Sequence, residues 1–420
     1  PAVSAKETKM IPVPEKRIAD FENMGFGMFI HYGLYSQLGQ GEWIMNSAKI
    51  SREEYAKLAS TFTARDFDAR AIARTAKAAG MKYITLTTRH HDGFSLYDTK
   101  GLSDFDAPHS AAGRDLVREF VDACNEEGLL PVFYHTTIDW HVESYEKDFK
   151  RYLQYLQDSV EILCTQYGKI GGLWFDGNWA RPAGDWDEDG LYKTIRRHQP
   201  DALIVNNTGL DARGATGHPE IDSVTFEQGH PEPMHREGMP KYVAAEMCHT
   251  MNDHWGFGKG DLHYKSLTEM IETLCACRKV GANYLLNVGP DGNGNIIPLQ
   301  KSILQGMGDW IRICGNCIYT GRPSEIKGER KNFALEDGRG AYLFVHDLGV
   351  IGSANVVVDG GGLGYKYFKN VQKKVKRVFW TDNNEELDFV QHGDNLWFNA
   401  TGFPYGCNYV VRIAQAEFEA

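Results

Sequence analysis

Short apolar segments alternate with amphipathic ones between residues 25 and 290, and this alternation allows few folds. Eight of the apolar segments read as strands, and each ends in polar or aromatic residues. They span residues 25–33, 83–90, 129–136, 171–178, 202–209, 223–228, 244–250 and 282–289. Apolar strands separated by amphipathic helices are typical of a parallel sheet covered by helices. Eight such units predict an α/β fold in which the sheet closes into a (β/α)₈ barrel.

Most of the connecting segments carry ordinary helix signals. An apolar stripe runs through residues 116–124, and Ser266 with Glu269 forms a capping box before another helix. The connectors 209–222 and 228–242 differ, because their glycine, proline and histidine content does not suit regular helices. We therefore expect the barrel to be irregular at these two connectors.

The hydrophobic period changes to two near residue 324, which indicates an antiparallel sheet. Runs of this kind occupy residues 341–346, 355–358, 375–380, 396–399 and 409–413. We expect residues 1–324 to form a catalytic (β/α)₈-like barrel and residues 325–420 to form a C-terminal antiparallel β-sandwich.

Charge and composition limit the partners that this chain can have. Its hydrophobic fraction of 42% is ordinary for a globular protein, and its net charge of −11 disfavours nucleic acid and anionic membranes. No segment has the 18 or so consecutive apolar residues of a membrane span. The cysteines fall in apolar patterns, which favours a reducing, cytoplasmic location; removal of a signal peptide stays open as an alternative. Barrel enzymes of this size commonly self-associate, so a homo-oligomer is possible.

The predicted strands end in an unusual set of side chains. In a barrel of this kind the active site is built at the C-terminal ends of the strands. The ends carry histidines, carboxylates, amides and aromatic rings, at His31, His90, His91, Tyr134, His135, Asp176, Asn206, Asn207, Glu227 and Glu246. Such a mixture suits a sugar, whose hydroxyls need hydrogen-bond partners and whose ring needs an apolar surface. Two carboxylates, Asp176 and Glu227, suit cleavage of a glycosidic bond.

Six sequence motifs resemble those of one enzyme family. They are GFGMFIHYG (25–33), GEW (41–43), TRHHDGF (88–94), VFYH (132–135), GGLWFDG (171–177) and ANYLLNVGPDGNG (282–294). In this order the motifs are similar to those of the α-L-fucosidases of glycoside hydrolase family 29, over residues 20–325. The resemblance implies a retaining hydrolase that removes terminal α-L-fucosyl residues from oligosaccharides or glycoconjugates. It also implies an irregular barrel followed by a β-sandwich, and no cofactor.

The resemblance also implies roles for individual residues. It makes Asp176 the nucleophile and Glu227 the general acid/base, with Glu246 as a rival for the second role. Residues that would hold the hydroxyls of fucose are His31, Glu42, Trp43, His90, His91 and Tyr134. Apolar surfaces for the sugar ring and its methyl group would come from Phe29, Trp174 and Trp255. One departure is Thr208, because some relatives place a sugar-contacting arginine there; the contact is either missing or supplied by another segment.

Three points stay open from the sequence. Strand alternation would point only one of His90 and His91 toward a ligand, unless a bulge turns both inward. A histidine-rich rim could also belong to a metal-dependent barrel hydrolase, although strand one lacks a His-x-His pair, so we predict no metal ligands. A catalytically silent fucose-binding protein is a further alternative, which the presence of both Asp176 and Glu227 disfavours.

Overall fold

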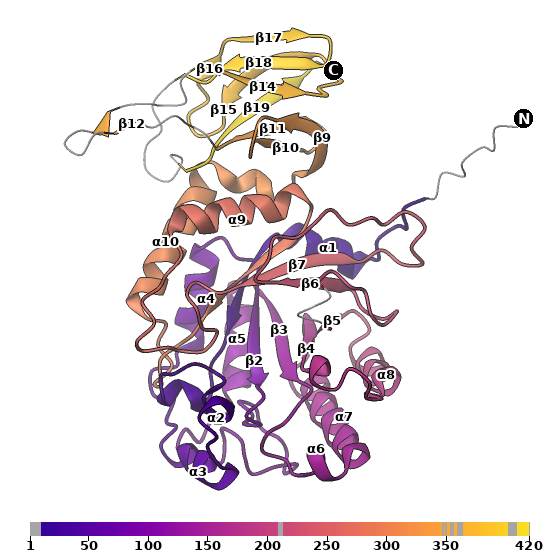
Figure 1. The fold of residues 1–420 in the computed structure, drawn as a ribbon, viewed down its shortest axis with the longest axis vertical. Helices are drawn as coiled ribbons and strands as arrows, with labels where there is room; N and C mark the ends of the chain where they lie inside the picture. The colour runs from indigo at the N-terminus through magenta and orange to yellow at the C-terminus, as the bar shows by residue number, and fades with distance from the viewer. Residues whose placement is uncertain are drawn as a thin grey trace, which may run out of the picture.

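A computed structural model describes residues 10–208, 213–346, 348, 351–352, 357–358, 364–401 and 410–419. Eight parallel strands close into a barrel in the order β1 to β8, with β1 paired to both β2 and β8 (Figure 1). Their bounds are β1 (Phe26–Ile30), β2 (Tyr83–Arg89), β3 (Leu130–Thr136), β4 (Gly172–Asp176), β5 (Leu203–Asn207), β6 (Ser223–Glu227), β7 (Ala244–His249) and β8 (Asn283–Val288). The predicted barrel is confirmed. Residue 209, at the end of the fifth predicted strand, lies outside the described residues.

Helices cover the outside of the barrel. They are α1 (Lys16–Met24), α2 (Ile44–Ser47), α3 (Arg52–Ala56), α4 (Ala69–Ala78), α5 (Leu116–Glu127), α6 (Ser144–Lys147), α7 (Phe149–Gln166), α8 (Glu188–His198), α9 (Leu267–Lys279) and α10 (Pro298–Ile313). Short 3₁₀ turns are η1 (Leu34–Gln37), η2 (Lys57–Ser60), η3 (Asn178–Ala180) and η4 (Gly315–Ile318). The predicted cap is present, since the Ser266 hydroxyl accepts a hydrogen bond from the Glu269 backbone N–H at 3.1 Å. None of the described helices is long and apolar enough to cross a bilayer.

The barrel is irregular on both sides of β6, as predicted. The described parts of the connectors, 213–222 and 228–243, contain no helix. β6 pairs with β7 from Ser223↔Ala244 to Glu227↔Cys248, whereas its register with β5 is recorded at Val205↔Ser223 alone. Backbone pairing therefore attaches β6 to β7 along its whole length and to β5 only near its start.

A nine-stranded antiparallel sheet follows the barrel, in the order β16-β15-β19-β11-β10-β9-β14-β18-β17. Its ends approach each other, because Trp380 on β15 meets Phe398 on β18 edge-on and the Gln391 amide oxygen on β17 accepts a hydrogen bond from the Val375 N–H on β15. The strands are β9 (Arg322–Gly328), β10 (Phe333–Glu336), β11 (Gly340–Val345), β14 (Tyr365–Lys369), β15 (Val375–Trp380), β16 (Glu386–Leu387), β17 (Phe389–His392), β18 (Asn395–Asn399) and β19 (Arg412–Phe418). β12 (Ile351–Gly352) and β13 (Val357–Val358) form a separate pair. Of the runs predicted here, residues 355–356 and 409 lie outside the described residues.

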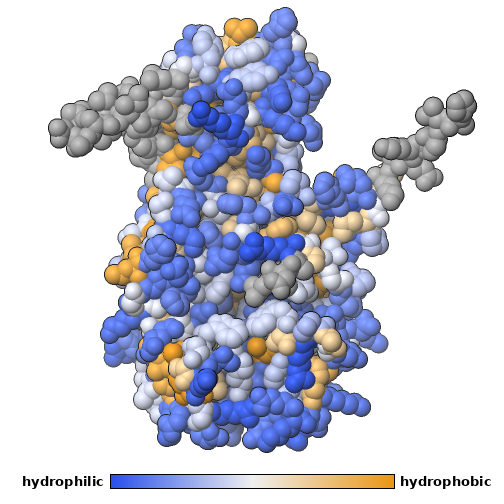
Figure 2. Space-filling view, viewed as in Figure 1, coloured by the Kyte–Doolittle hydropathy of each residue, from blue (hydrophilic) through white to orange (hydrophobic). Residues whose placement is uncertain are grey.

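The second sheet packs on the barrel through α9 and α10 (Figure 1). The indole N–H of Trp310 on α10 donates to the Val411 carbonyl at 2.8 Å, and Phe344 and Ile413 extend the barrel's core cluster into the sheet. Hydrophilic side chains cover most of the face seen in Figure 2, in line with the acidic composition. The buried apolar contacts of α9 and α10 therefore join the barrel to the nine-stranded sheet.

Two glycines of α10 test how closely it packs. A Cβ added at Gly308 would lie 2.1 Å from the Ala78 carbonyl oxygen on α4, so the backbones would have to separate. We expect Gly308→Ala to lower the free energy of unfolding by about 1–3 kcal/mol despite the gain in helix propensity. Gly306→Ala is the matched control, because its Cβ would meet the mobile tip of Leu267. Urea unfolding compares the two, and equal stability of both variants would contradict the packing argument.

Candidate active site

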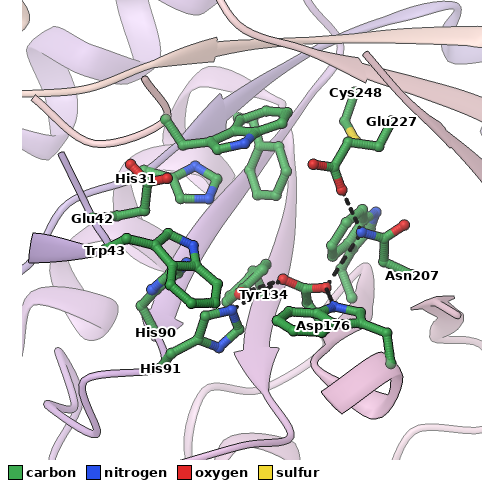
Figure 3. Close-up of a pocket in the computed structure, with 14 residues that line it drawn as sticks. His31, Glu42, Trp43, His90, His91, Tyr134, Asp176, Asn207, Glu227 and Cys248 are labelled. Atoms are coloured by element: carbon green, nitrogen blue, oxygen red, sulfur yellow. Dashed lines mark hydrogen bonds and ion pairs between the residues drawn. The ribbon is translucent and has the colours of Figure 1, made fainter. Parts of the chain in front are cut away.

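The C-terminal ends of the barrel strands surround a pocket of about 180 Å³ (Figure 3). This volume is below the roughly 300–1,000 Å³ of pockets for drug-sized ligands, and it suits a single sugar ring. All eleven residues predicted as catalytic or sugar-binding line it, leaving aside the rival Glu246. The full lining is Phe29, His31, Glu42, Trp43, His90, His91, Tyr134, Trp174, Asp176, Trp179, Asn207, Glu227, Cys248 and Trp255.

Asp176 is the last residue of β4, and several donors surround its carboxylate (Figure 3). The Tyr134 hydroxyl donates to Oδ2 at 3.0 Å, and the Trp179 indole N–H donates to Oδ1 at 2.9 Å. Nε2 of His91 lies 3.4 Å from Oδ2. Burial would raise the pKa of Asp176, but His91, Trp179 and Tyr134 more than offset it and hold the pKa below its usual value. The carboxylate is therefore ionised at neutral pH.

The Asp-Gly sequence at the end of β4 makes the turn that returns Trp179 to this carboxylate. Gly177 has φ 127°, which side chains rarely allow, and a Cβ there would lie 2.7 Å from the Thr137 hydroxyl. The 3₁₀ turn η3 follows at once and carries Trp179 back over Asp176. The turn and the carboxylate thus form one structural unit.

Glu227 is the last residue of β6 and shares a donor with Asp176 (Figure 3). The Asn207 amide nitrogen lies 2.6 Å from Glu227 Oε2 and 3.3 Å from Asp176 Oδ1. The Thr225 hydroxyl donates to the Asn207 amide oxygen at 2.8 Å, which fixes the orientation of the amide. The two oxygens bonded to this nitrogen therefore lie no more than about 6 Å apart, which is compatible with the roughly 5–5.5 Å between the carboxyl groups of retaining glycosidases.

The environments of the two carboxyl groups separate their pKa values. Burial, and then the charge of Asp176, raise the pKa of Glu227 to about 7, while the hydrogen bond from Asn207 acts in the opposite direction. Asp176 is ionised at neutral pH, and a large fraction of Glu227 carries a proton. One ionised and one protonated carboxyl group is the pairing that acid-assisted attack on a glycosidic bond requires.

A guanidinium group also acts on Glu227. Arg213, from the connector after β5, lowers the pKa of Glu227 by its positive charge. A Cβ added at Gly229 would lie 2.4 Å from Arg213 Nη1, so the glycine leaves room for the guanidinium beside the end of β6. Arg213 therefore places a positive charge near Glu227.

His31 presents a hydrogen-bond acceptor to the pocket. Its Nδ1 lies 2.7 Å from the Asn287 amide oxygen, while the Asn287 amide nitrogen donates to the Trp255 carbonyl at 2.7 Å. Burial lowers the pKa of His31 to about 3, so the ring is neutral and its single proton is on Nδ1. Nε2 is therefore free to accept a hydrogen bond, for example from a sugar hydroxyl.

His90 and His91 both line the pocket, which strand alternation alone did not predict. The β2–β3 register shifts between Thr87 and Arg89, and both histidines follow the last residue of β2. Their rings lie 4.2 Å apart, and His90 stacks on Tyr134. A bulge, the second of the two alternatives, thus brings both imidazoles to one site. His90 Nδ1 is buried and has no hydrogen-bond partner among the described residues.

Aromatic side chains form the walls. Phe29 contacts Trp174 at 5.2 Å and Trp255 at 5.8 Å between ring centroids, so the three rings predicted as apolar surfaces form one cluster. Trp43 is 38% exposed and stacks on Trp179 at the pocket edge. Its neighbour Glu42 accepts a hydrogen bond from the Gly256 N–H at 2.7 Å. The pocket thus combines an apolar wall with fixed polar groups.

Glu246 lies elsewhere. It is the third residue of β7 and not its end, and it is not among the pocket-lining residues. The Trp174 indole N–H donates to it at 2.9 Å, and the Tyr83 hydroxyl donates to its other oxygen. Burial raises the pKa of Glu246 to about 7, as it does for Glu227. Glu246 therefore orients Trp174 from behind.

Three lining residues were not predicted: Asn207, Trp179 and Cys248. Asn207 is the register partner of Asp176 across β4 and β5, a relation that the strand ends Trp174-Phe175-Asp176 and Asn206-Asn207 would suggest once the strands are aligned. Trp179 and Cys248 carry no signal of this kind in the sequence. Within the described ranges, no group of three or more His, Cys, Asp or Glu side chains has a geometry that could hold a metal ion.

The family of this chain follows from comparison with known proteins. A sequence profile described as alpha-L-fucosidase matches residues 5–316. The chain belongs to the α-L-fucosidase family. It is an enzyme of the glycoside hydrolase class. Tissue alpha-L-fucosidase of Rattus norvegicus is 28% identical over 358 residues, which are 78% of this chain and 76% of the relative.

Solved structures of this family share the fold. Alpha-L-fucosidase isoenzyme 1 from Paenibacillus thiaminolyticus is 31% identical, with a TM-score of 0.81 over 96% of this chain and 99% of its own. An alpha-L-fucosidase from Bacteroides thetaiotaomicron is 20% identical, with a TM-score of 0.81 over the whole of both chains. The barrel and the following sheet are therefore the fold of the family.

Trp179→Phe tests the hydrogen bonds to Asp176. Loss of the indole donor destabilises the carboxylate and raises its pKa, so fewer molecules carry an ionised Asp176 at low pH. We expect the acidic limb of kcat/KM for an aryl α-L-fucoside to move upward by about one pH unit, since a hydrogen bond to a charged group contributes about 1.5–3 kcal/mol. Trp140→Phe is the control, because that indole contacts Trp43 and His91. An unmoved acidic limb in Trp179→Phe would count against the assigned role.

Proposed function

We propose that this chain is a retaining α-L-fucosidase that hydrolyses terminal α-L-fucosyl residues by double displacement. The observation that carries the proposal is the pair of carboxyl groups bound to one amide nitrogen, with Asp176 ionised and Glu227 close to half protonated at neutral pH. The nearest oxygens of the pair lie within about 6 Å of each other, which supports direct attack by one carboxylate on the sugar.

In the first step, an Asp176 oxygen attacks the anomeric carbon as the bond from that carbon to the leaving oxygen breaks. Glu227 gives its proton to the leaving oxygen, so the aglycone departs as an alcohol and the sugar remains as an ester of Asp176. Because Asn207 donates to Oε2 of Glu227, we assign the transferable proton to Oε1.

In the second step, ester formation removes the negative charge of Asp176, which is one cause of the raised Glu227 pKa. The pKa of Glu227 then falls, and its carboxylate takes a proton from water. The water oxygen bonds to the anomeric carbon, the ester bond breaks, and Asp176 returns to a carboxylate. Two inversions give a product with the configuration of the substrate.

The remaining residues hold the sugar in this scheme. His31 Nε2 accepts a hydrogen bond from a sugar hydroxyl, His90 and Glu42 supply further polar partners, and the cluster of Phe29, Trp174 and Trp255 meets the apolar face of the ring. Relatives support the mechanism: the Bacteroides thetaiotaomicron structure is a trapped covalent intermediate with 2-fluoro-fucosyl fluoride, and one from Thermotoga maritima holds a mechanism-based inhibitor.

The nucleophile is tested by Asp176→Ala together with the stereochemistry of the wild-type product. We expect the variant to remain folded and to lose turnover of 4-nitrophenyl α-L-fucoside, because no other carboxylate replaces the attacking oxygen. Proton NMR of the wild-type reaction should show α-L-fucose as the first product, before mutarotation. Initial release of β-L-fucose would exclude a covalent Asp176 ester, and absence of turnover in the wild type would favour a silent binder.

The acid/base is tested by comparing Glu227→Ala with Glu246→Ala. Loss of the acid should slow hydrolysis of methyl α-L-fucoside by roughly 10²–10⁴-fold, because a poor leaving group needs a proton. The 4-nitrophenyl substrate should be affected less, and azide should partly restore its turnover by attacking the ester without base assistance. Glu246→Ala should slow both substrates alike, because it disturbs Trp174. The reverse pattern, with azide rescue in Glu246→Ala alone, would reassign the acid/base.

A further inference from the structure

We propose that Asp222 is a positioning residue that fixes strand β6, and with it Glu227, relative to Asp176. The proposal rests on the function proposed above, since it concerns the separation of the two carboxyl groups. Asp222 immediately precedes β6, and Glu227 is the last residue of the same strand. The strand is short and buried, so a shift at its start reaches its end.

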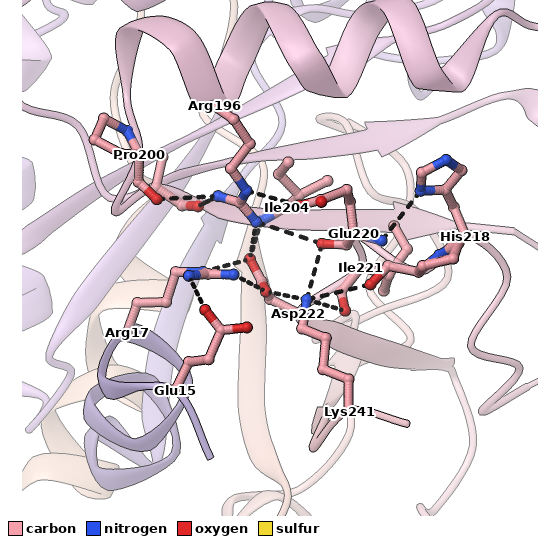
Figure 4. A network of polar contacts seen from close by, with 12 residues as sticks. Glu15, Arg17, Arg196, Pro200, Ile204, His218, Glu220, Ile221, Asp222 and Lys241 are labelled. Carbon is pink, nitrogen blue, oxygen red and sulfur yellow. Dashed lines mark hydrogen bonds and ion pairs between the residues drawn. The ribbon is translucent and has the colours of Figure 1, made fainter. Parts of the chain in front are cut away.

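Asp222 is fully buried and binds three cations (Figure 4). Arg17 on α1 donates to it twice, at 2.9 and 3.1 Å, and Arg196 on α8 and Lys241 in the β6–β7 connector each donate at 2.8 Å. The Ile204 N–H on β5 donates to the same carboxylate at 2.9 Å. One side chain thereby joins four segments that are distant in sequence.

The charges around Asp222 balance within this network. Glu15 pairs with Arg17 at 2.5 Å, and Glu220 pairs with Arg196 at 2.8 Å, so three carboxylates face three cations. Burial alone would raise the pKa of Asp222, but Arg17, Lys241 and Arg196 more than offset it, and the pKa lies below its usual value. Removing the charge of Asp222 would leave the three cations repelling one another around a buried site.

Asp222 also supplies backbone bonds where the barrel is least continuous. Its N–H donates to the Ile204 carbonyl on β5 at 2.8 Å, and its carbonyl accepts from the Ala244 N–H on β7 at 2.8 Å. The recorded β5–β6 register is the single pair Val205↔Ser223. Asp222 therefore attaches the start of β6 to β5, while at the other end the side chain of Asn207 spans the gap to Glu227.

This placement has a specific catalytic consequence. If β6 moves away from β5, Glu227 moves away from Asp176 and from the leaving oxygen, whereas Asp176 stays on β4 with its own donors. A displacement of about 1 Å can reduce a rate by about 10²-fold when a reacting group loses its alignment. The loss should fall on proton donation, and so on poor leaving groups, and not on the attack itself.

The test is Asp222→Asn, which keeps the shape of the side chain and removes its charge. We expect kcat/KM to fall at least about tenfold more for methyl α-L-fucoside than for 4-nitrophenyl α-L-fucoside, a fraction of the roughly 10²–10⁴-fold that full loss of an acid causes. A fall in kcat/KM that is equal for both substrates, which leaves the ratio of the two values unchanged, would overturn the proposal. If Asp222→Asn does not fold, Lys241→Met removes one of the three cations and should change the ratio in the same direction; an unchanged ratio there would also overturn it.

Asp382→Asn is the matched control for lost stability. Asp382 lies between β15 and β16 of the C-terminal sheet, strands that Figure 1 shows apart from β6, and its buried side chain pairs with the buried Arg412 at 2.8 Å. The Asp382→Asn variant should have a lower melting temperature and an unchanged ratio of kcat/KM between the two fucosides. If this ratio changes as much as in Asp222→Asn, it reports only stability, and the proposal is overturned. Glu227→Ala calibrates the ratio. If the wild type hydrolyses neither substrate, or Glu227→Ala leaves the ratio unchanged, the proposed function fails instead.

Discussion

One amide nitrogen, that of Asn207, donates to both carboxyl groups of the pocket, and the chemistry of the site depends on this contact. It holds Asp176 and Glu227 close enough that both cannot easily be ionised. Other donors decide which one keeps the charge: His91, Trp179 and Tyr134 contact Asp176, whereas Glu227 has a hydrogen bond from the Asn207 amide. The unequal supply of donors separates two similar groups into one that is ionised and one that is largely protonated, the pair on which the proposed mechanism rests.

The barrel holds this pair of carboxyl groups at the place where its strand pairing is incomplete, between β5 and β6. Regular βα units on β1 to β4 fix Asp176, while β6 lies between two connectors without helices in their described parts. Side chains replace backbone pairing there, with the Asp222 network at the start of β6 and the Asn207–Thr225 bridge at its end. We infer that the missing backbone pairing between β5 and β6 leaves space for the sugar. Polar side chains then fix the distance between the two strands.

Much of this could be predicted from the sequence, for reasons that differ between residues. The barrel strands are uniformly apolar, so periodicity located them, and the turn residue Gly177 marked the end of β4. Asn207 was named among the strand-end residues but was given no role, because an asparagine at a strand end is an ordinary residue and its contacts arise from strand register. Glu246 was placed at a strand end but lies three residues before it, a shift that decides whether a side chain reaches the pocket. Whether both His90 and His91 reach the pocket depended on a bulge in β2, which the hydrophobic period of the sequence cannot show.

The central claim is that Asp176 forms a covalent ester with the sugar, and trapping that ester tests it most directly. The 2-fluoro group of 2-fluoro-fucosyl fluoride slows both steps, while its fluoride leaving group keeps ester formation faster than ester breakdown. A variant without Glu227 slows breakdown further, so the intermediate should accumulate. Intact-mass spectrometry and peptide mapping should then find one 2-fluorofucosyl group, on the peptide that contains Trp174-Phe175-Asp176. A label on Glu227 or Glu246, or turnover of the reagent by the wild type with no labelled species, would contradict the account.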